Sequence, residues 1–189
     1  MTAPRLPKLS PAELDEQQRA LYDAIASGPR ARGPQLFALT DDACHLEGPF
    51  NAMLLSPTVG GALQALGTAV RYGSGLADRD REIAILVVAH AWDCAFEVYA
   101  HEPVGRVAGL SDDELATLRT GDYERLAEHD RLVATTSFAL AVRSALTDDE
   151  FGAARDALGL HLLFELTTLV GYYATLALQL RVFKVSTPS

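Results

Sequence analysis

Apolar side chains recur at helical rather than strand spacing along most of the chain. Three segments begin with a Ser or Thr that is followed three residues later by Glu, the order of a capping box, and they start at Ser10, Ser111 and Thr147. Gly121 and Gly159 would end the second and the third of these helices. The pattern predicts further helices over residues 58–71, 80–91, 93–108, 122–145 and 160–182. Strand patterns are almost absent, so the predicted fold class is all-α.

Prolines and glycines cluster between residues 28 and 57, which favours an extended, irregular arm. We therefore expect one domain over residues 1–189, with an N-terminal helix and the arm at 1–57 and a helical core at 58–189. The stretches at 109–121 and 145–159 resemble each other, which indicates a possible internal helical duplication. Two similar capped helices could also arise without one.

The stretch from Ile83 to Ala89 is apolar on every side, which predicts a helix in the centre of the protein. Glu82 precedes it and has two interpretations. It is either a first-turn carboxylate favoured by the helix dipole, or a carboxylate at the edge of a buried cavity, where desolvation would raise its pKa. The first interpretation is the simpler one.

Cys94, Glu97 and His101 follow at intervals of three and four residues, which places them on one helical face. Asp93 is a candidate N-cap, and a first-turn thiol beside the positive helix end would have a lowered pKa. Taken singly, Cys94 could be a buried hydrophobe, and Glu97 with His101 a surface pair. Their combination, next to the most apolar helix, favours a catalytic site.

Metal binding is an alternative for the same face. Glu97 and His101 could supply two ligands, with a third from Glu82 or His90. The chain has no HExxH motif, no CxxC pair and no histidine cluster, so no metal and no other cofactor is predicted.

Composition narrows the classes of partner. The net charge of −9 argues against nucleic acid, because binding phosphates needs a basic surface. The N-terminus does not resemble a signal peptide, the apolar run at 166–180 is shorter than a membrane span, and two cysteines are too few for a disulfide framework. We expect a soluble cytoplasmic protein that acts on a small molecule without a membrane partner.

The stretch DREIAILVVAHAWDCAFEVYAHEPVGRVAGLSDDELATL, residues 80–118, resembles the central motif of the carboxymuconolactone decarboxylase family, which includes the alkylhydroperoxidase D (AhpD) proteins. Glu82, Cys94 and His101 fall on the family's glutamate, first cysteine and histidine, with spacings of twelve and seven residues. The segments at 48–57 and 164–185 resemble a longer branch of the family. The resemblance implies an AhpD-like helical fold and a homo-oligomer, a trimer or a hexamer.

Glu97 stands where the peroxidase branch has its second cysteine, the one that attacks peroxide. Cys94 therefore has no partner three residues away, and Cys44 lies in a distant segment. A two-thiol cycle needs both sulfurs within reach, so AhpD-like hydroperoxide reduction through Cys94 is the less favoured alternative. A sulfenic acid on Cys94 alone stays open.

The decarboxylase-like branch implies acid–base chemistry on a small carboxylated lactone or oxo acid, by decarboxylation or a related lyase or isomerase step. In that chemistry His101 would donate a proton, Glu82 would orient it, and Glu97 would be a second carboxylate. An imine route is disfavoured because the only lysines are Lys8 and Lys184, near the termini.

Two further questions stay open. The guanidinium for an anionic substrate could come from any of four arginines, Arg71, Arg79, Arg81 or Arg143. A non-catalytic member that binds a small apolar molecule is a third functional class. Trp92, Phe96 and Tyr99 could line such a pocket or simply belong to the core.

Overall fold

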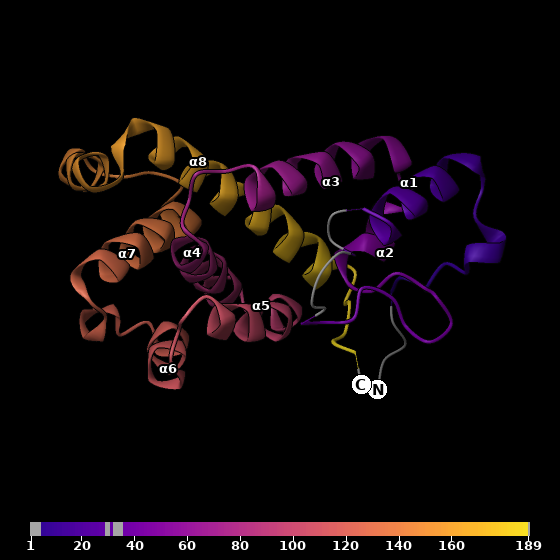
Figure 1. Cartoon of the computed structure of the whole chain (residues 1–189), viewed down its shortest axis with the longest axis horizontal. Helices are drawn as coiled ribbons and strands as arrows, with labels where there is room; N and C mark the ends of the chain where they lie inside the picture. The colour runs from indigo at the N-terminus through magenta and orange to yellow at the C-terminus, as the bar shows by residue number, and fades with distance from the viewer. Residues whose placement is uncertain (1–4, 29–30, 32–35, 189) are drawn as a thin grey trace.

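The computed structural model describes residues 5–28, 31 and 36–188, and this part of the chain is mostly helical (Figure 1). Two short 3-10 helices are η1 (Pro11–Glu13) and η3 (Tyr123–Arg125). The α-helices are α1 (Glu16–Ala26), α2 (Pro49–Met53), α3 (Pro57–Tyr72), α4 (Asp78–Ala91), α5 (Ala95–Val107), α6 (Asp112–Thr120), α7 (Glu128–Arg143) and α8 (Asp148–Val182). Within the described ranges no strand forms, and one isolated bridge joins Thr40 and Leu46. The all-α prediction is confirmed.

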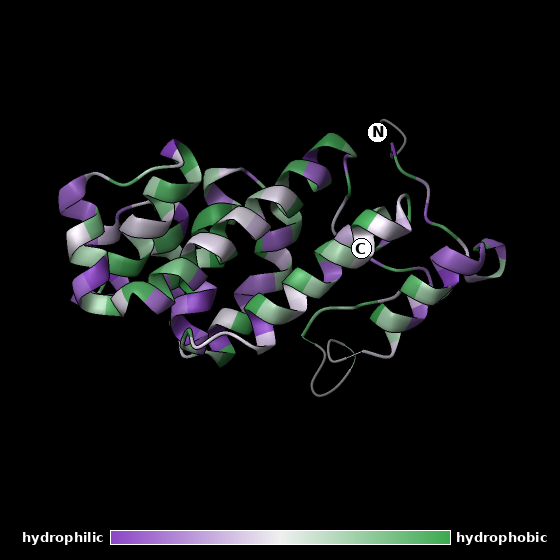
Figure 2. Cartoon of the chain, turned by 90° about the horizontal axis from the view of Figure 1, so that it is seen from above, coloured by the Kyte–Doolittle hydropathy of each residue, from purple (hydrophilic) through white to green (hydrophobic). Residues whose placement is uncertain are grey.

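Helix α4 lies at the centre of the helical core, with α5, α6, α7 and α8 packed against it (Figure 1). Its residues from Ile83 to Ala89 are each at most 1% exposed, as their uniform apolarity predicts. Figure 2 shows that hydrophilic and hydrophobic positions alternate along the surrounding helices, which turn one face to the core and the other outward. A polar side chain that α4 carries next to this stretch, such as that of Glu82, is therefore shielded from water.

The capping boxes form at Ser111 and Thr147, each of whose hydroxyls accepts a hydrogen bond from the N–H of a Glu three residues on. Ser10, in contrast, caps only the short helix η1. Helix α1 begins later, after Asp15, which forms its own box with Gln18. The predicted start at Ser10 is confirmed for one 3-10 turn only, because the chain becomes extended at Leu14.

Two other predicted segments also differ from the structure. The helix predicted over 122–145 is divided, because the chain is extended at Leu126 between η3 and α7. The predicted arm at 28–57 contains the short buried helix α2, and its residues 29–30 and 32–35 lie outside the described part. The boundaries proposed for a single domain and the internal duplication stay predictions.

Helix α8 is interrupted at Gly159, as its sequence predicts. Gly159 has φ 77° and ψ 162°, so the helical run of 35 residues bends there. In Figure 1 the part before the bend is seen nearly end-on, and the part after it runs diagonally through the molecule. By length and composition α8 could cross a membrane, and a third of its most apolar window is buried. Its break and its packing against α3, α4 and α7 are typical of a core helix.

Candidate active site

Glu82 and His101 form the centre of a buried polar cluster. Glu82 lies one turn into α4 and is fully buried, and His101 on α5 is 4% exposed. The Nδ1 atom of His101 is 2.7 Å from the Oε2 atom of Glu82. An ionised carboxylate can only accept, so Nδ1 carries a proton and donates it. This leaves Nε2 as the nitrogen that can exchange a proton with another group.

Glu97 lies on the other side of the imidazole. Its Oε2 atom is 3.5 Å from the Nε2 atom of His101, one helical turn along α5. Its side chain is also buried. His101 is therefore held between two carboxylates, one at each ring nitrogen, which is an arrangement through which a proton can pass from one side of the ring to the other.

Arg71 and Tyr173 complete the cluster from α3 and α8. The Arg71 guanidinium Nη1 is 3.5 Å from Glu82 Oε1 and 3.4 Å from the Tyr173 hydroxyl, to which it donates. The Tyr173 ring meets His101 edge-on, at 5.2 Å between centroids. Burial raises the pKa of Tyr173 well above its ordinary range, so its hydroxyl stays protonated.

The charge state of Glu82 follows from two opposing effects. Burial alone would raise its pKa, but the neighbouring His101 lowers it through charge and hydrogen bonding, and Arg71 and Arg81 lower it further. The pKa of Glu82 is lowered overall, so this carboxylate is ionised at neutral pH. The expectation of a raised pKa in a buried cavity is wrong. The alternative of a simple first-turn carboxylate does not describe a fully buried, paired group either.

A small cavity of about 20 Å³ opens beside His101 and Glu97. Four aromatic side chains, Phe37, Phe50, Phe96 and Tyr172, contribute to its walls, together with Arg71 and Tyr173. A volume of this size holds one or two water molecules. The cavity thus brings one carboxylate, that of Glu97, together with an imidazole and a guanidinium. Glu82 does not line it and acts through its hydrogen bond to His101.

Cys94 does not share this cavity. It is the N-cap residue of α5, not Asp93, which adopts the left-handed conformation with φ 49°. The thiol packs in an apolar cluster with Phe96 and Leu180. Burial raises its pKa to about 11, although backbone N–H groups of the first turn act in the opposite direction. The expected lowering of the Cys94 pKa is therefore wrong.

The second cysteine, Cys44, is exposed on the arm before α2, and both thiols are free. The face predicted to carry Cys94, Glu97 and His101 together is therefore divided between two environments. Glu97 and His101 face the cavity, and Glu82 contacts His101 from α4, whereas Cys94 belongs to the neighbouring apolar cluster.

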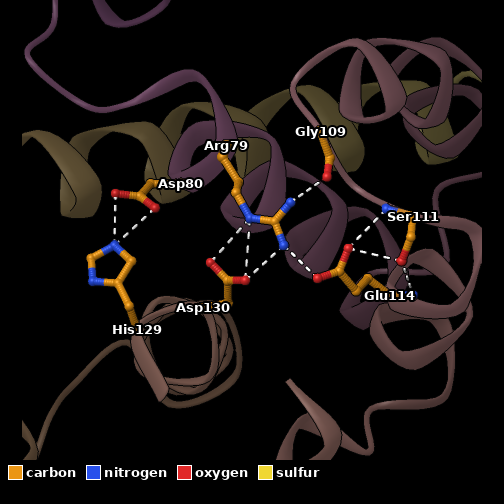
Figure 3. Close-up of polar contacts among 7 residues, drawn as sticks. All are labelled: Arg79, Asp80, Gly109, Ser111, Glu114, His129 and Asp130. Atoms are coloured by element: carbon orange, nitrogen blue, oxygen red, sulfur yellow. Dashed lines mark hydrogen bonds and ion pairs between the residues drawn. The ribbon is translucent and has the colours of Figure 1, made fainter. Parts of the chain in front are cut away.

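The structure separates the four candidate arginines. Arg71 alone among them lines the cavity. Arg79 instead ties α4 to its neighbours, with hydrogen bonds to Asp130, Glu114 and the Gly109 carbonyl (Figure 3). The other two pair with carboxylates of their own surroundings, Arg81 with Asp78 and Arg143 with Glu150.

The three aromatic candidates also separate. Phe96 lines the cavity, whereas the indole N–H of Trp92 donates to the Ala141 carbonyl and Tyr99 is exposed. Over the described residues, no three His, Cys, Asp or Glu side chains are placed to hold one metal ion. His90, the other suggested ligand, is half-buried and has a lowered pKa because of burial.

Sequence reasoning did not identify Tyr172, Tyr173, Phe37 or Phe50 as parts of the site. Two adjacent tyrosines within the otherwise apolar run at 166–180 were the available signal for the first pair. A buried hydroxyl needs a partner, so such a pair indicates a polar group nearby. Phe37 and Phe50 lie in the irregular arm, where no periodicity indicates which side chain points inward.

Residues 57–126 match the model of the carboxymuconolactone decarboxylase family. This segment is similar to that family over less than half of the chain. It contains Glu82, Cys94, Glu97 and His101, so the resemblance seen in the motif is confirmed. Phe37, Phe50 and Tyr173, which complete the site, lie outside the matched segment of the family.

Two solved structures share the fold. One is a protein of unknown function from Agrobacterium tumefaciens, named as an antioxidant defence protein AhpD, with 22% identity and a TM-score of 0.67 over 74% of this chain and 97% of that one. The other is the alkylhydroperoxidase AhpD core of an uncharacterized peroxidase-related protein from Ralstonia eutropha JMP134, with 13% identity and a TM-score of 0.77 over 100% of this chain and 94% of that one. No curated protein matches the chain at a significant level. At these identities the two neighbours establish the AhpD-like helical fold.

Proposed function

We propose that this protein is an acid–base enzyme that decarboxylates, or otherwise transfers a proton on, a small carboxylated lactone or oxo acid. The observation that carries the proposal is the buried order Glu82–His101–Glu97 beside an enclosed cavity. Proton transfer needs a group of adjustable protonation that is held by a fixed partner and faces the substrate. His101 is the group whose protonation can change, and Glu82 is its fixed partner. The cavity beside His101 and Glu97 is where the substrate would lie.

In a decarboxylation the bond between the carboxylate and the adjacent carbon breaks, and its electron pair stays on that carbon as an enolate-like anion. Carbon dioxide leaves, and the anion must then receive a proton. His101 would deliver it from Nε2 while Glu82 retains the hydrogen bond at Nδ1. After this transfer Nε2 needs a new proton. Glu97 lies close enough to Nε2 to pass it one from solvent.

Arg71 supports the same chemistry by charge. Its contacts with Glu82 and Tyr173 are long, at 3.5 and 3.4 Å, so they do not fix the guanidinium as tightly as a bidentate pair would. A guanidinium on the cavity wall stabilises an anionic group on the substrate and the charge that develops after carbon dioxide leaves. This assigns to Arg71 the role for which four arginines were candidates.

A thiol-dependent hydroperoxide reductase is the second candidate, because both structural neighbours carry names of peroxidase-related proteins. The position of Cys94 argues against it. A thiol with a pKa of about 11 is almost entirely protonated at neutral pH, and the thiolate is the form that attacks peroxide. Glu97 also occupies the place of the second cysteine.

The test is carbon dioxide release from a panel of carboxylated lactones and 3-oxo acids. We expect His101→Gln to lower kcat/KM by about 100-fold or more, the usual contribution of a general acid, while circular dichroism and thermal unfolding show a folded protein. His161→Gln is the matched control, because His161 is an exposed histidine on α8, and it should retain full activity. Full activity of the His101 variant, or no turnover of any panel member by the wild type, would contradict the proposal.

A further inference from the structure

The cavity beside His101 is too small for a substrate. Its volume is about 20 Å³, whereas sites for organic ligands typically measure about 300 Å³ or more. Any molecule larger than water therefore reaches His101 only after part of the wall moves. The question is which part of the wall can move at the lowest cost in free energy.

Phe37 is the wall residue best suited to move. It is only partly buried, whereas the other arm residue on the wall with an aromatic ring, Phe50, is 4% exposed and belongs to helix α2. Phe37 is carried by the irregular segment 36–47, which has no helix of its own. Within it Leu39 and Leu46 are buried, whereas residues 36–38 are exposed or only partly buried. Such loosely packed residues move more readily than packed helices. Displacing Phe37 would widen the cavity without unfolding α2, α5 or α8.

The segment 36–47 is closed on itself and is held from outside by Lys8 and by the Tyr22 hydroxyl, which donates a hydrogen bond to the Cys44 carbonyl. Its ends approach at the bridge between Thr40 and Leu46. The Lys8 ammonium then bonds Asp41 at 2.8 Å and Glu47 at 2.5 Å, one near each side of this bridge. Of these two carboxylates, Glu47 is buried.

Lys8 is itself fixed to the rigid part of the molecule. The side chain of Asn51, on helix α2, accepts a hydrogen bond from the Leu9 N–H and donates one to the Pro7 carbonyl. The residues on both sides of Lys8 are thus tied to a buried helix. Lys8 connects this fixed point to the segment that carries Phe37.

We propose that Phe37 gates the cavity and sets the size of the molecule that reaches His101, and that the ion pairs of Lys8 with Asp41 and Glu47 hold the gate closed. The argument needs only the closed cavity and its wall, so it stands apart from the reaction proposed above. Opening moves Phe37 and the exposed residues beside it, while Leu39 and Leu46 stay in the core and α4 and α5 keep Glu82 and His101 in place.

Cys94 is a built-in probe of this opening. Its thiol is 2% exposed, and Phe37 packs against the apolar cluster that contains it. Movement of Phe37 would uncover that cluster, and the thiol would then react with a maleimide. Cys44 is exposed and would react first, so the experiment uses a Cys44→Ser background in which Cys94 is the single thiol.

The measurement is the rate of Cys94 modification by a small and a bulky maleimide, followed by intact-mass spectrometry. We expect Phe37→Ala to raise the rate of Cys94 modification with both reagents, because the side chain that covers the cluster is removed. The increase should be larger for the bulky maleimide. Lys8→Met should raise the rate roughly fivefold, the effect of a modest change in an opening equilibrium. Arg143→Met, which removes an exposed ion pair with Glu150, should leave the rate unchanged.

Low concentrations of urea distinguish a gate from global unfolding. Opening of a short segment exposes little surface, so its rate should hardly depend on urea, whereas global unfolding depends on it steeply. Faster, urea-insensitive modification in the Phe37 and Lys8 variants supports the gate. Rates equal to the parent, or increases that follow the loss of global stability, would overturn it.

Discussion

Two polar clusters on helix α4 use similar residues for different ends. The first surrounds Arg79 in the opening turn, where Glu114 and Asp130 bind its guanidinium (Figure 3). The second surrounds Glu82, three residues further along the helix. The side chain of Arg79 is 28% exposed, whereas that of Glu82 has no exposure.

The clusters also differ in how fully their hydrogen bonds are made. Arg79 donates through Nε, Nη1 and Nη2 at distances of 3.3 Å or less, and hydrogen bonding to Asp130 and Glu114 raises its pKa. Arg71, in the second cluster, makes contacts of 3.4 and 3.5 Å beside a cavity. The short hydrogen bonds of the Arg79 cluster join helices, while the longer contacts of Arg71 beside a cavity can be exchanged for contacts with a ligand.

The sharpest test of this contrast is Glu82→Gln. It leaves the Arg71 guanidinium in a buried place without its carboxylate partner. We expect the free energy of unfolding at pH 7 to fall by about 3–5 kcal/mol, measured by urea denaturation. Glu114→Gln, at the exposed cluster, is the matched control and should cost clearly less. Equal losses in the two variants would show that burial does not separate the clusters.

The same variant predicts a pH dependence. The pKa of Glu82 is lowered in the folded protein, so its ionised form stabilises the fold above its ordinary value of 4.5. This contribution is lost as the pH falls below 4.5 toward the lowered pKa. The difference in unfolding free energy between wild type and Glu82→Gln should therefore shrink in acid. A difference that stays constant from pH 7 to pH 3 would count against an ionised Glu82.

Arg79→Met should lower the free energy of unfolding less than Glu82→Gln does, and it should leave activity unchanged. It removes charged hydrogen bonds that connect α4 to α6 and α7, at an expected cost of about 2 kcal/mol in unfolding free energy. Because Arg79 does not line the cavity, carbon dioxide release by the folded variant should match the wild type. Loss of activity without loss of stability would place Arg79 in the site after all.

Cys94→Ala should have the smallest effect. The thiol is a packing group in an apolar cluster, so its loss should cost about 1 kcal/mol of stability and leave turnover unchanged. In the wild type, brief exposure to a hydroperoxide should leave Cys94 unmodified in an intact-mass spectrum. Rapid oxidation confined to Cys94 and reversed by added thiol would instead favour the peroxidase candidate.

The sequence predicts the buried central helix well, because residues 83–89 of α4 are apolar on every side. It also places Glu82 and His101 in the family motif, and the structure brings these two residues into contact. It predicts the Cys94 pKa wrongly. Helical spacing places Cys94 near Glu97, but it does not show that the N-cap turns toward Leu180 in a neighbouring apolar cluster.

Residues that reach the site from elsewhere could not be ranked. Arg71 comes from α3 and Tyr173 from α8, and the packing of α3 on α8 and of α8 on α4 brings them to the site. The closed cavity is likewise a property of tertiary packing, since Phe37 belongs to a segment without periodicity. Residue spacing within a helix shows which of its side chains share a face. It does not show which side chains of other helices contact that face.

Because of the bend at Gly159, the side-chain directions in the first part of α8 do not determine those in the second part. A straight helix of 35 residues would span roughly 50 Å and would fix the direction of every side chain relative to every other. The conformation of Gly159 is one that residues with a Cβ avoid, and it ends that coupling. A residue gained or lost between 148 and 158 would therefore leave Tyr173 facing His101. The part before the bend packs through Ala154 and Leu158 in a register of its own, while the part after it keeps its register with the site.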